Sequence, residues 1–355
     1  MADLFENPLG TDGFEFVEFT GDSAHLHTVF IELGFVPVAK HKYRNVTLYR
    51  QGQISFILND RENGQAPEFT QSHAVGANAM AFRVKNAQKA YDHAIASGAT
   101  PAKDYGEVTG LRIPAIEGIG GSLLYFVDMY GDRGSIYDVD FEYIQDDHWP
   151  KGAGLTYIDH LTHNVNRGNM DKWAGFYEDI FNFREIRYFD IEGKITGLKS
   201  RAMTSPCGQI RIPINESSDD KSQIEEFLDR FNGEGIQHIA LGSDDILSSV
   251  EILKENGVPF QSTPDTYYER LDARLPGHGE DVERLRELQV LVDGAPTEGQ
   301  GTLLQIFTQD AMGPVFFEFI QRKGNEGFGE GNFQALFESI EQDQIRRGVL
   351  EDTGS

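Results

Sequence analysis

GIQHIAL (235–241), continued by ILSSVEILKENGVPF (246–260), has an earlier copy in GANAMAF (76–82) followed by AQKAYDHAIASGATP (87–101). In both copies the opening glycine and the glycine near the end are 22 residues apart, so the copies align without a gap. Each pattern is typical of an apolar strand, an amphipathic helix, and a helix-ending glycine followed by a proline. The chain is therefore interpreted as a duplication of one structural unit.

Two looser pairs extend the duplication to the rest of the chain. GFEFVEFTG (13–21) resembles YIDHLTHNV (157–165) as a strand, and SLLYFVDMYGDRG (122–134) resembles PVFFEFIQRKG (314–324). Strand-like runs such as NVTLYRQGQISFIL (45–58) outnumber the helical ones. These patterns predict an α+β fold in which each half is a sheet curled around a central space with helices outside.

The polar stretch DDHWPKGAG (146–154) divides the two halves. Its proline and glycines are typical of a connection between domains. We expect an N-terminal domain at 1–150 and a C-terminal domain at 151–355. The last segment, GNFQALFESIEQDQIRR (331–347), has an apolar stripe at helical spacing and predicts a final helix with Asn332 as its N-cap.

The formal charge of the chain is −26, from 31 Lys and Arg against 57 Asp and Glu. Nucleic acids and anionic membranes bind basic surfaces, so neither is an expected partner. The sequence also has no apolar run of about 18 residues and no secretory signal at its N-terminus. A single cysteine, Cys207, is typical of a reducing compartment, and we expect a cytoplasmic protein. An anionic substrate would need a local positive centre in so acidic a chain.

Three positions change in kind between the copies. His238 aligns with Ala79, while His160 aligns approximately with Phe16 and Glu318 with Val127. In each case the C-terminal copy has a residue type that binds metals where the N-terminal copy has an apolar residue.

Glu318 lies in the apolar run VFFEFI (315–320), where an unpaired carboxylate would cost several kcal/mol or become protonated. A bound divalent cation would remove this cost, so we expect one metal site, in the C-terminal half.

Several alternatives remain open from the residues alone. Each histidine could be a hydrogen-bonded core residue, and Glu318 could face solvent between two inward phenylalanines. His163 competes with His160, because residues three apart in a strand point to opposite faces. Two histidines and one carboxylate are typical of oxygen-activating iron(II) but also serve zinc hydrolases. The sequence contains no HExxH, CxxC or P-loop motif.

Six motifs in order resemble the 4-hydroxyphenylpyruvate dioxygenase family, bacterial form: IDHLTHNV (158–165), PINES (213–217), GIQHIAL (235–241), LLQIFT (303–308), FFEFIQRKG (316–324) and GFGEGNFQALFESIE (327–341). The resemblance implies the vicinal-oxygen-chelate fold, with two domains of paired βαβββ modules that each form an open barrel. It implies Fe(2+) bound by His160, His238 and Glu318, and it leaves His163 outside the ligand set because the family's first histidine follows Ile-Asp.

The resemblance also implies the reaction and the pocket. Members of the family convert 4-hydroxyphenylpyruvate and O2 to homogentisate and CO2 in tyrosine catabolism. The polar residues around the keto acid and the phenol would be Ser200, Asn215, Gln223 and Gln237, and the glutamine beside the metal would be Gln305. The apolar walls would be Pro213, Phe307 and Phe316. The closing C-terminal loop and helix would contribute Phe328, Asn332 and Phe333. Gln223 is the weakest transfer, because NESSDDKSQ (215–223) differs from many relatives in composition.

Other functions compete with this one. A 4-hydroxymandelate synthase would share the metal site and the substrate, but its closing helix typically has a smaller aliphatic residue in place of Phe333. A metal-free binding protein and a ring-cleaving catechol dioxygenase are further alternatives. We expect a homodimer or a homotetramer.

Overall fold

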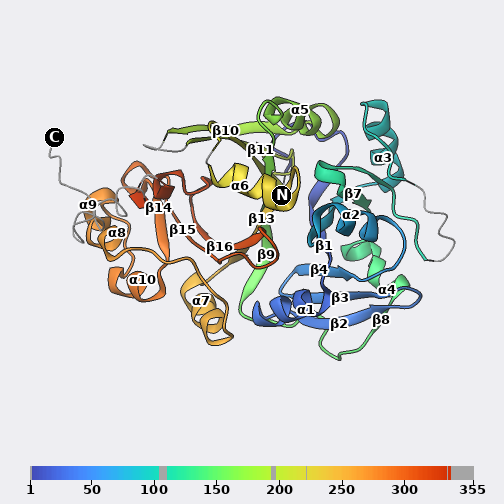
Figure 1. The fold of residues 1–355 in the computed structure, drawn as a ribbon, viewed down its shortest axis with the longest axis horizontal. Helices are drawn as coiled ribbons and strands as arrows, with labels where there is room; N and C mark the ends of the chain where they lie inside the picture. Colours follow the sequence, from blue (N-terminus) through green and yellow to red (C-terminus); the bar gives the residue numbers. More distant parts are fainter. Residues whose placement is uncertain (1, 104–109, 193–196, 221, 334, 337–355) are drawn as a thin grey trace.

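A computed structural model of the chain describes residues 2–103, 110–192, 197–220, 222–333 and 335–336. Two sheets of eight strands lie side by side, one from each half of the sequence (Figure 1). The chain thus has the mixed α and β content and the two curled sheets expected from its sequence.

The N-terminal sheet has the strand order β6-β7-β5-β1-β4-β3-β2-β8. Its strands are β1 (Thr11–Thr20), β2 (Val36–His41), β3 (Val46–Gln51), β4 (Ile54–Asn59), β5 (Gly76–Val84), β6 (Ala115–Glu117), β7 (Leu123–Val127) and β8 (Phe141–Tyr143). The helices of this half are α1 (Ser23–Glu32), α2 (Gln65–His73), α3 (Ala87–Ala96) and α4 (Ile136–Asp140).

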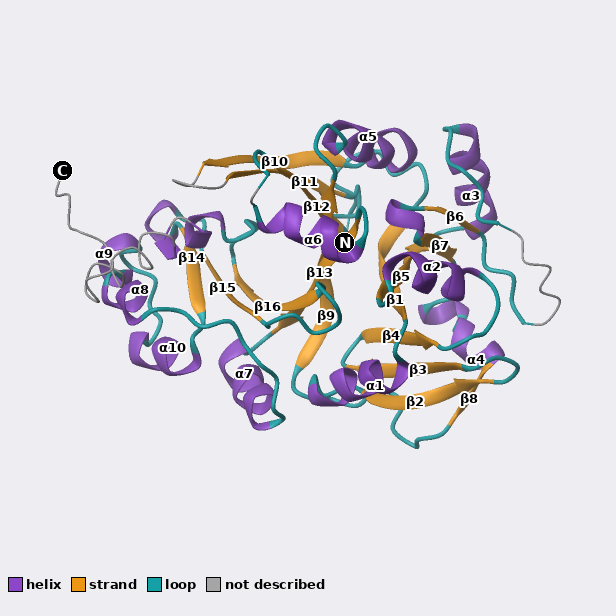
Figure 2. Cartoon of the chain, viewed as in Figure 1, coloured by secondary structure: helices purple, strands orange, loops and turns teal. Residues whose placement is uncertain are grey.

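The C-terminal sheet has the order β10-β11-β12-β9-β13-β16-β15-β14. Its strands are β9 (Leu155–Val165), β10 (Arg184–Glu192), β11 (Gly197–Thr204), β12 (Arg211–Ser217), β13 (Gly235–Ser243), β14 (Leu291–Gly294), β15 (Thr302–Phe307) and β16 (Phe316–Lys323). The helices are α5 (Met170–Phe181), α6 (Gln223–Phe231), α7 (Ile246–Glu255), α8 (Asp265–Glu269), α9 (Leu271–Arg274) and α10 (Val282–Leu288). Figure 2 shows this sheet curled, with α5 and α7 on its outer side.

The duplication is visible in the helix ends as well as in the strands. Asn86 caps α3 by accepting a hydrogen bond from the Lys89 amide, and Asp245 caps α7 in the same way. Gly98 and Gly257, just after these helices, have φ of +97° and +93°, a conformation that only glycine adopts without strain. The sequence pattern therefore predicted these two helices and the glycines that end them correctly.

Strand pairing fixes which residues correspond between the halves. Ala240 in β13 pairs with His160 of β9 on one side and with Glu318 of β16 on the other. Ala81 of β5 is the counterpart of Ala240, and it pairs with Phe16 of β1 on one side and with Tyr125 of β7 on the other.

The proposed correspondences of His160 with Phe16 and of His238 with Ala79 are confirmed by this register. The counterpart of Glu318 is Tyr125, so the expected alignment with Val127 is wrong by two residues. The sequences of β7 and β16 are too dissimilar to reveal a register that their pairing with β5 and β13 determines.

Aromatic side chains join the two halves. Phe82 of β5 lies 5.5 Å from Phe181 at the end of α5 and 6.1 Å from Phe183, measured between ring centroids. Phe56 of β4 lies 6.0 Å from Phe317 of β16. These rings are buried, and each contributes about 1.5–3 kcal/mol by leaving water.

The chain after β16 differs from its prediction at one residue. Residues 330–333 are helical, so Asn332 lies inside the helix and is not its N-cap. Asp293 instead accepts a hydrogen bond from the Gly331 amide, and Glu330 accepts one from the Phe328 amide. Most of the predicted final helix, including Phe337 and Ile340 of its stripe, lies outside the described residues. Among the described residues, no helix is both long enough and apolar enough to span a bilayer.

Candidate metal centre

Three neighbouring strands bring His160, His238 and Glu318 together. β9, β13 and β16 lie side by side in the centre of the C-terminal sheet, and each contributes one of the three side chains. All three are nearly inaccessible to solvent, with exposed fractions of 2%, 9% and 2%. The predicted candidates therefore converge on one buried point, and Glu318 does not face solvent.

The distances suit a shared ion. His160 Nε2 lies 3.1 Å and His238 Nε2 lies 3.3 Å from the same oxygen, Oε2 of Glu318. One ligand atom from each residue lies within 4.8 Å of the others. Neighbouring ligands of one metal ion with bonds of about 2.1 Å lie roughly 3 Å apart. The second carboxylate oxygen, Oε1, is buried without any hydrogen-bond partner, which is costly unless a cation compensates it.

The electrostatics favour an ionised carboxylate and one neutral histidine. Burial alone would raise the pKa of Glu318, but the two facing histidines hold it below its usual value. Burial would lower the pKa of His160, but Glu318 and Asp159 raise it instead. Burial dominates at His238 and lowers its pKa. In the absence of an ion a proton on His160 would balance Glu318, so a metal ion and this proton compete for one site.

Each histidine has a partner on its second nitrogen. His160 Nδ1 lies 2.8 Å from Oδ1 of Asp159, and His238 Nδ1 lies 3.0 Å from Oε1 of Gln237. Both partners accept a hydrogen bond from Nδ1–H, so in the neutral ring Nε2 keeps a lone pair directed at the shared point. The Thr162 hydroxyl also lies 2.9 Å from His238 Nε2.

Asp159 belongs to a buried ion pair behind the metal site. It is fully buried, and Arg322 of β16 donates to both of its oxygens at 2.7 and 2.8 Å. Burial would raise the pKa of Asp159, but Arg322 and His160 hold it well below its usual range. The carboxylate stays charged and so keeps the imidazole of His160 oriented.

His163 lies outside the metal-binding group. It points away from the triad, and its Nε2 lies 2.7 Å from the hydroxyl of Tyr177 on α5. Complete burial lowers its pKa to about 3, so the ring is neutral and Nε2 accepts a hydrogen bond from the tyrosine hydroxyl. This histidine packs the helix onto the sheet.

Three phenylalanines surround the triad. Phe316 stacks on the His238 ring at 4.9 Å, Phe307 meets the same ring edge-on at 6.4 Å, and Phe328 meets His160 edge-on at 5.3 Å. Such apolar walls exclude water and strengthen electrostatic interactions at the centre.

Gln305 of β15 is buried beneath the segment that carries Phe328. Its exposed fraction is 1%, and its Oε1 has no hydrogen-bond partner. The backbone of Gly329, with φ of +77°, packs directly on this amide. A side chain at Gly329 would displace the Gln305 amide, and the positive φ at this position also favours glycine.

The comparisons with known proteins agree with this geometry. Two family models match the chain: "Hydroxyphenylpyruvate dioxygenase, HPPD, N-terminal" over residues 5–142, and "Glyoxalase/Bleomycin resistance protein/Dioxygenase superfamily" over residues 157–271. The 4-hydroxyphenylpyruvate dioxygenase of Pseudomonas aeruginosa is 62% identical over 349 residues, 97% of each chain. The chain belongs to the 4-hydroxyphenylpyruvate dioxygenase family.

Two further relatives show the range of names around this family. A Vibrio vulnificus protein named hemolysin VllY is 62% identical, and the alignment covers 97% of this chain and 98% of that protein. The solved structure of a 4-hydroxymandelate synthase variant from Streptomyces coelicolor is 26% identical, with a TM-score of 0.78 and coverage of 94% and 99%.

The remaining residues implied by the family lie on β11, β12, α6 and the segment after β16. Ser200 pairs with Asn215 across β11 and β12, and Pro213 is buried two residues before Asn215. Gln223 is exposed in the first turn of α6. Phe333 is 37% exposed beside the buried Asn332.

Asp159, Arg322 and Thr162 were missed from the sequence. Asp159 and Thr162 are neighbours of His160 in IDHLTH, so the motif itself offered a signal. The sequence gave no signal for Arg322, because it lies 163 residues from Asp159 and only the folded sheet brings the two together.

Proposed function

We propose that this chain is an Fe(2+)-dependent 4-hydroxyphenylpyruvate dioxygenase that converts 4-hydroxyphenylpyruvate and O2 to homogentisate and CO2. The observation that carries the proposal is the buried group of His160, His238 and Glu318, all ligand-type residues, in a chain of this family. One oxygen atom of O2 enters the new carboxylate and the other the ring, so the equation balances with no second oxidant.

The donor set fits iron(II). Two imidazole nitrogens and one carboxylate form the facial arrangement that non-haem iron oxygenases use. When bound, Fe(2+) supplies a positive centre for the keto acid and the redox chemistry that O2 requires. The protein contributes one negative charge, from Glu318, so the centre keeps a net charge of about +1 and attracts an anion into a chain of net charge −26.

The walls of the pocket position the aromatic substrate. We assign Phe307, Phe316 and Phe328 to its faces, because all three contact the histidines of the triad. Pro213 adds an apolar wall on β12. Fixing the ring between such side chains holds the reacting carbon near the centre and excludes water.

Polar side chains recognise the two ends of the substrate. Gln305 is assigned to the keto acid end, because its buried Oε1 lacks a partner beside the closing loop. Ser200 and Asn215 are assigned to the phenol end as a cross-strand pair. In this proposal Gln237 orients His238 by accepting its Nδ1 hydrogen bond. Gln223 is kept as a substrate-binding residue only because the family pattern implies it.

The segment from Phe328 to Phe333 closes the pocket. Asn332 is 1% exposed, and its Oδ1 accepts a hydrogen bond of 2.6 Å from the Tyr267 hydroxyl on α8. Tyr267 is held in turn by the Val292 amide at 2.9 Å. This anchor fixes the closing segment against β14, and opening it would admit substrate.

In this proposal residues 1–150 form a metal-free scaffold and residues 151–355 the catalytic domain. The homodimeric or homotetrameric state and the cytoplasmic location stay predictions.

Oxygen uptake is the test of the function. Metal-stripped protein is reconstituted with Fe(2+) and given 4-hydroxyphenylpyruvate, and the product is identified by chromatography. We expect one O2 consumed per homogentisate formed and no turnover with Zn(2+). A 4-hydroxymandelate product would contradict the reaction, and uptake with catechols but not with the keto acid would contradict the substrate.

A further inference from the structure

Thr162 brings a buried hydroxyl group to the metal centre. It follows His160 by two residues in β9, so both side chains lie on the same face of the strand. Thr162 is 1% exposed, and its Oγ1 lies 2.9 Å from Nε2 of His238. The same nitrogen lies 3.3 Å from Oε2 of Glu318. The hydroxyl therefore touches one of the atoms that would bind the metal ion.

The hydroxyl donates this hydrogen bond. Gln237 Oε1 can only accept, so Nδ1 of His238 carries the hydrogen of the neutral ring and Nε2 carries the lone pair. Thr162 thus donates to the lone pair that a metal ion needs. The hydroxyl and the ion compete for this nitrogen.

An ion at Nε2 would deprive Thr162 of its acceptor. Within the part of the chain that the structure describes, the hydroxyl has no second hydrogen-bond partner. Leaving a buried hydroxyl unpaired is costly, and the cost is removed if a bound ligand supplies a new acceptor.

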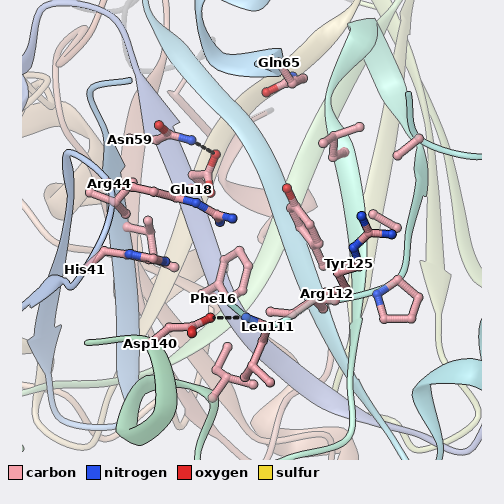
Figure 3. Close-up of a pocket in the computed structure, with 18 of the residues that line it drawn as sticks. Phe16, Glu18, His41, Arg44, Asn59, Gln65, Leu111, Arg112, Tyr125 and Asp140 are labelled. Carbon is pink, nitrogen blue, oxygen red and sulfur yellow. Dashed lines mark hydrogen bonds between the residues drawn. The ribbon is translucent and has the colours of Figure 1, made fainter. Parts of the chain in front are cut away.

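The N-terminal half places a polar side chain with its own partners at the same position. Glu18 of β1 is the counterpart of Thr162 in the strand register. Glu18 lines a cavity of about 430 Å3 in the N-terminal half (Figure 3). Its Oε1 accepts hydrogen bonds from the amides of Asn59 and Asn78 at 2.8 and 2.6 Å. Thr162 differs because its described partner is a candidate metal ligand.

An acceptor on the substrate would lie within reach of this hydroxyl. Neighbouring ligand atoms of one metal ion lie roughly 3 Å apart, so an oxygen bound next to His238 Nε2 also lies near Thr162 Oγ1. A 2-keto acid presents only acceptors to the centre, namely its carboxylate and keto oxygens. The phenylalanines that contact the two histidines, Phe307, Phe316 and Phe328, have no side-chain donor to offer them.

We propose that Thr162 is a further substrate-binding residue, whose hydroxyl donates to His238 in the metal-free chain and to a keto acid oxygen in the loaded one. This role depends on the proposed function, because it takes the substrate to be a 2-keto acid bound at the metal centre. Rotation about the C–O bond is enough to redirect the hydrogen, so the exchange needs no movement of the backbone.

The exchange predicts opposite effects of one substitution on two ligands. Thr162→Val keeps the branched shape of the side chain but removes the hydroxyl. Without its competitor at Nε2, Fe(2+) should bind more tightly. Without its donor, the keto acid should bind more weakly. A threonine that only packed the strand would weaken both ligands when replaced.

Anaerobic titration measures both affinities in the absence of turnover. Fe(2+) is titrated into the metal-stripped chain, and 4-hydroxyphenylpyruvate is titrated into the iron-loaded chain without O2. For Thr162→Val we expect Fe(2+) to bind about fivefold more tightly and the keto acid about tenfold more weakly. Thr162→Ser keeps the hydroxyl and should restore both affinities to those of the parent.

Thr20→Val is the matched control. Thr20 is a buried threonine of β1 whose Oγ1 lies 3.3 Å from that of Thr70, and it belongs to the N-terminal sheet. Its replacement should change neither affinity. Thr162→Ala removes the hydroxyl without adding a methyl group, so it should give the same two shifts even if Thr162→Val does not fold.

The outcomes separate this role from the proposed function. A parent chain that binds neither Fe(2+) nor the keto acid would overturn both. A parent that binds both ligands, with variants that weaken both together or leave either affinity unchanged, would overturn the role of Thr162 and leave the proposed function intact.

Discussion

The two sheets of this chain place equivalent strands in equivalent positions but carry different chemistry. In the C-terminal sheet Ala240 lies between His160 and Glu318, whose ligand atoms are 3.1 Å apart. In the N-terminal sheet Ala81 lies between Phe16 and Tyr125, whose rings touch at the same place. The backbone determines where these side chains converge, and three residues determine whether the point carries metal-ligand atoms or aromatic rings.

An ion pair between an acid and an arginine accompanies both convergence points. The acid that precedes the key residue of β1, Glu15, lies 2.6 Å from Arg83, and the corresponding acid of β9, Asp159, lies 2.7 Å from Arg322. The arginines come from different strands, β5 and β16. An acid paired with an arginine at this position is thus common to both sheets, and in the proposed function Asp159 also orients a metal ligand.

Removing the charge of Glu318 should have the largest effect. Glu318→Gln keeps the size of the side chain but loses the anion, so we expect loss of bound iron and a fall in turnover of about 1,000-fold or more. Metal analysis and oxygen uptake measure the two effects. Glu15→Gln, a buried carboxylate of the N-terminal sheet, should retain iron and turnover, and equal losses in both variants would remove the distinction between the halves.

The ion pair behind His160 should give the next largest effect. Asp159→Asn leaves Arg322 without its charged partner and replaces the charged acceptor of His160 by a neutral amide. We expect iron affinity to fall 10- to 100-fold and the free energy of unfolding to fall by about 3–5 kcal/mol.

Glu15→Gln is again the matched variant for this ion pair. It should lower the free energy of unfolding by less, because the Arg83 side chain is 27% exposed, and it should not change iron affinity. Unchanged iron affinity in Asp159→Asn would show that the ion pair serves stability only.

The segment that we propose closes the pocket follows β16 in the C-terminal half. Tyr267→Phe removes the hydroxyl that holds Asn332, and one hydrogen bond of about 1 kcal/mol corresponds to roughly a fivefold rise in KM. Steady-state kinetics measure this rise, with kcat changing less. Tyr268→Phe alters the adjacent buried ring, 5.0 Å away, and should leave KM near that of the parent. A rise of equal size in both would point to general loosening of α8.

The smallest effect concerns His163, which corresponds to Phe19 of β1. Its pKa is lowered to about 3, whereas an unfolded histidine has a pKa of about 6.5. Below pH 6.5 the unfolded chain therefore binds a proton that the folded chain excludes, and stability falls by up to about 1.4 kcal/mol per pH unit until the folded pKa is reached.

His163→Gln keeps an acceptor for Tyr177 but cannot titrate. We expect the variant to be less stable than the parent at pH 7. The difference between their free energies of unfolding, measured with urea, should narrow by about 1 kcal/mol on going to pH 5.5. A gap that stays constant over this range would show that His163 is not held neutral.

The sequence predicted the duplicated α+β fold, the helix ends at Gly98 and Gly257, and the convergence of His160, His238 and Glu318. These features follow from local patterns and from direct comparison of the two copies. From the residues alone, the choice between His160 and His163 and the identity of the metal stayed open. Only the family resemblance favoured His160 and iron(II).

Other features could not be read from local pattern. The correspondence of Glu318 with Tyr125 depends on strand register, which the dissimilar sequences of β7 and β16 do not encode visibly. The pairing of Asp159 with Arg322 and the capping of Gly331 by Asp293 join residues far apart in the chain. The N-terminal cavity depends on the space left between strands, which no motif describes.

Anaerobic titration of the metal-stripped chain with Fe(2+) tests the central claim most directly. The claim is that one of two equivalent convergence points became a metal site through three side chains. We predict that one Fe(2+) binds per chain and that none binds to Glu318→Gln. Two ions per chain, or one ion that still binds to Glu318→Gln, would contradict the assignment of the metal centre to the C-terminal sheet.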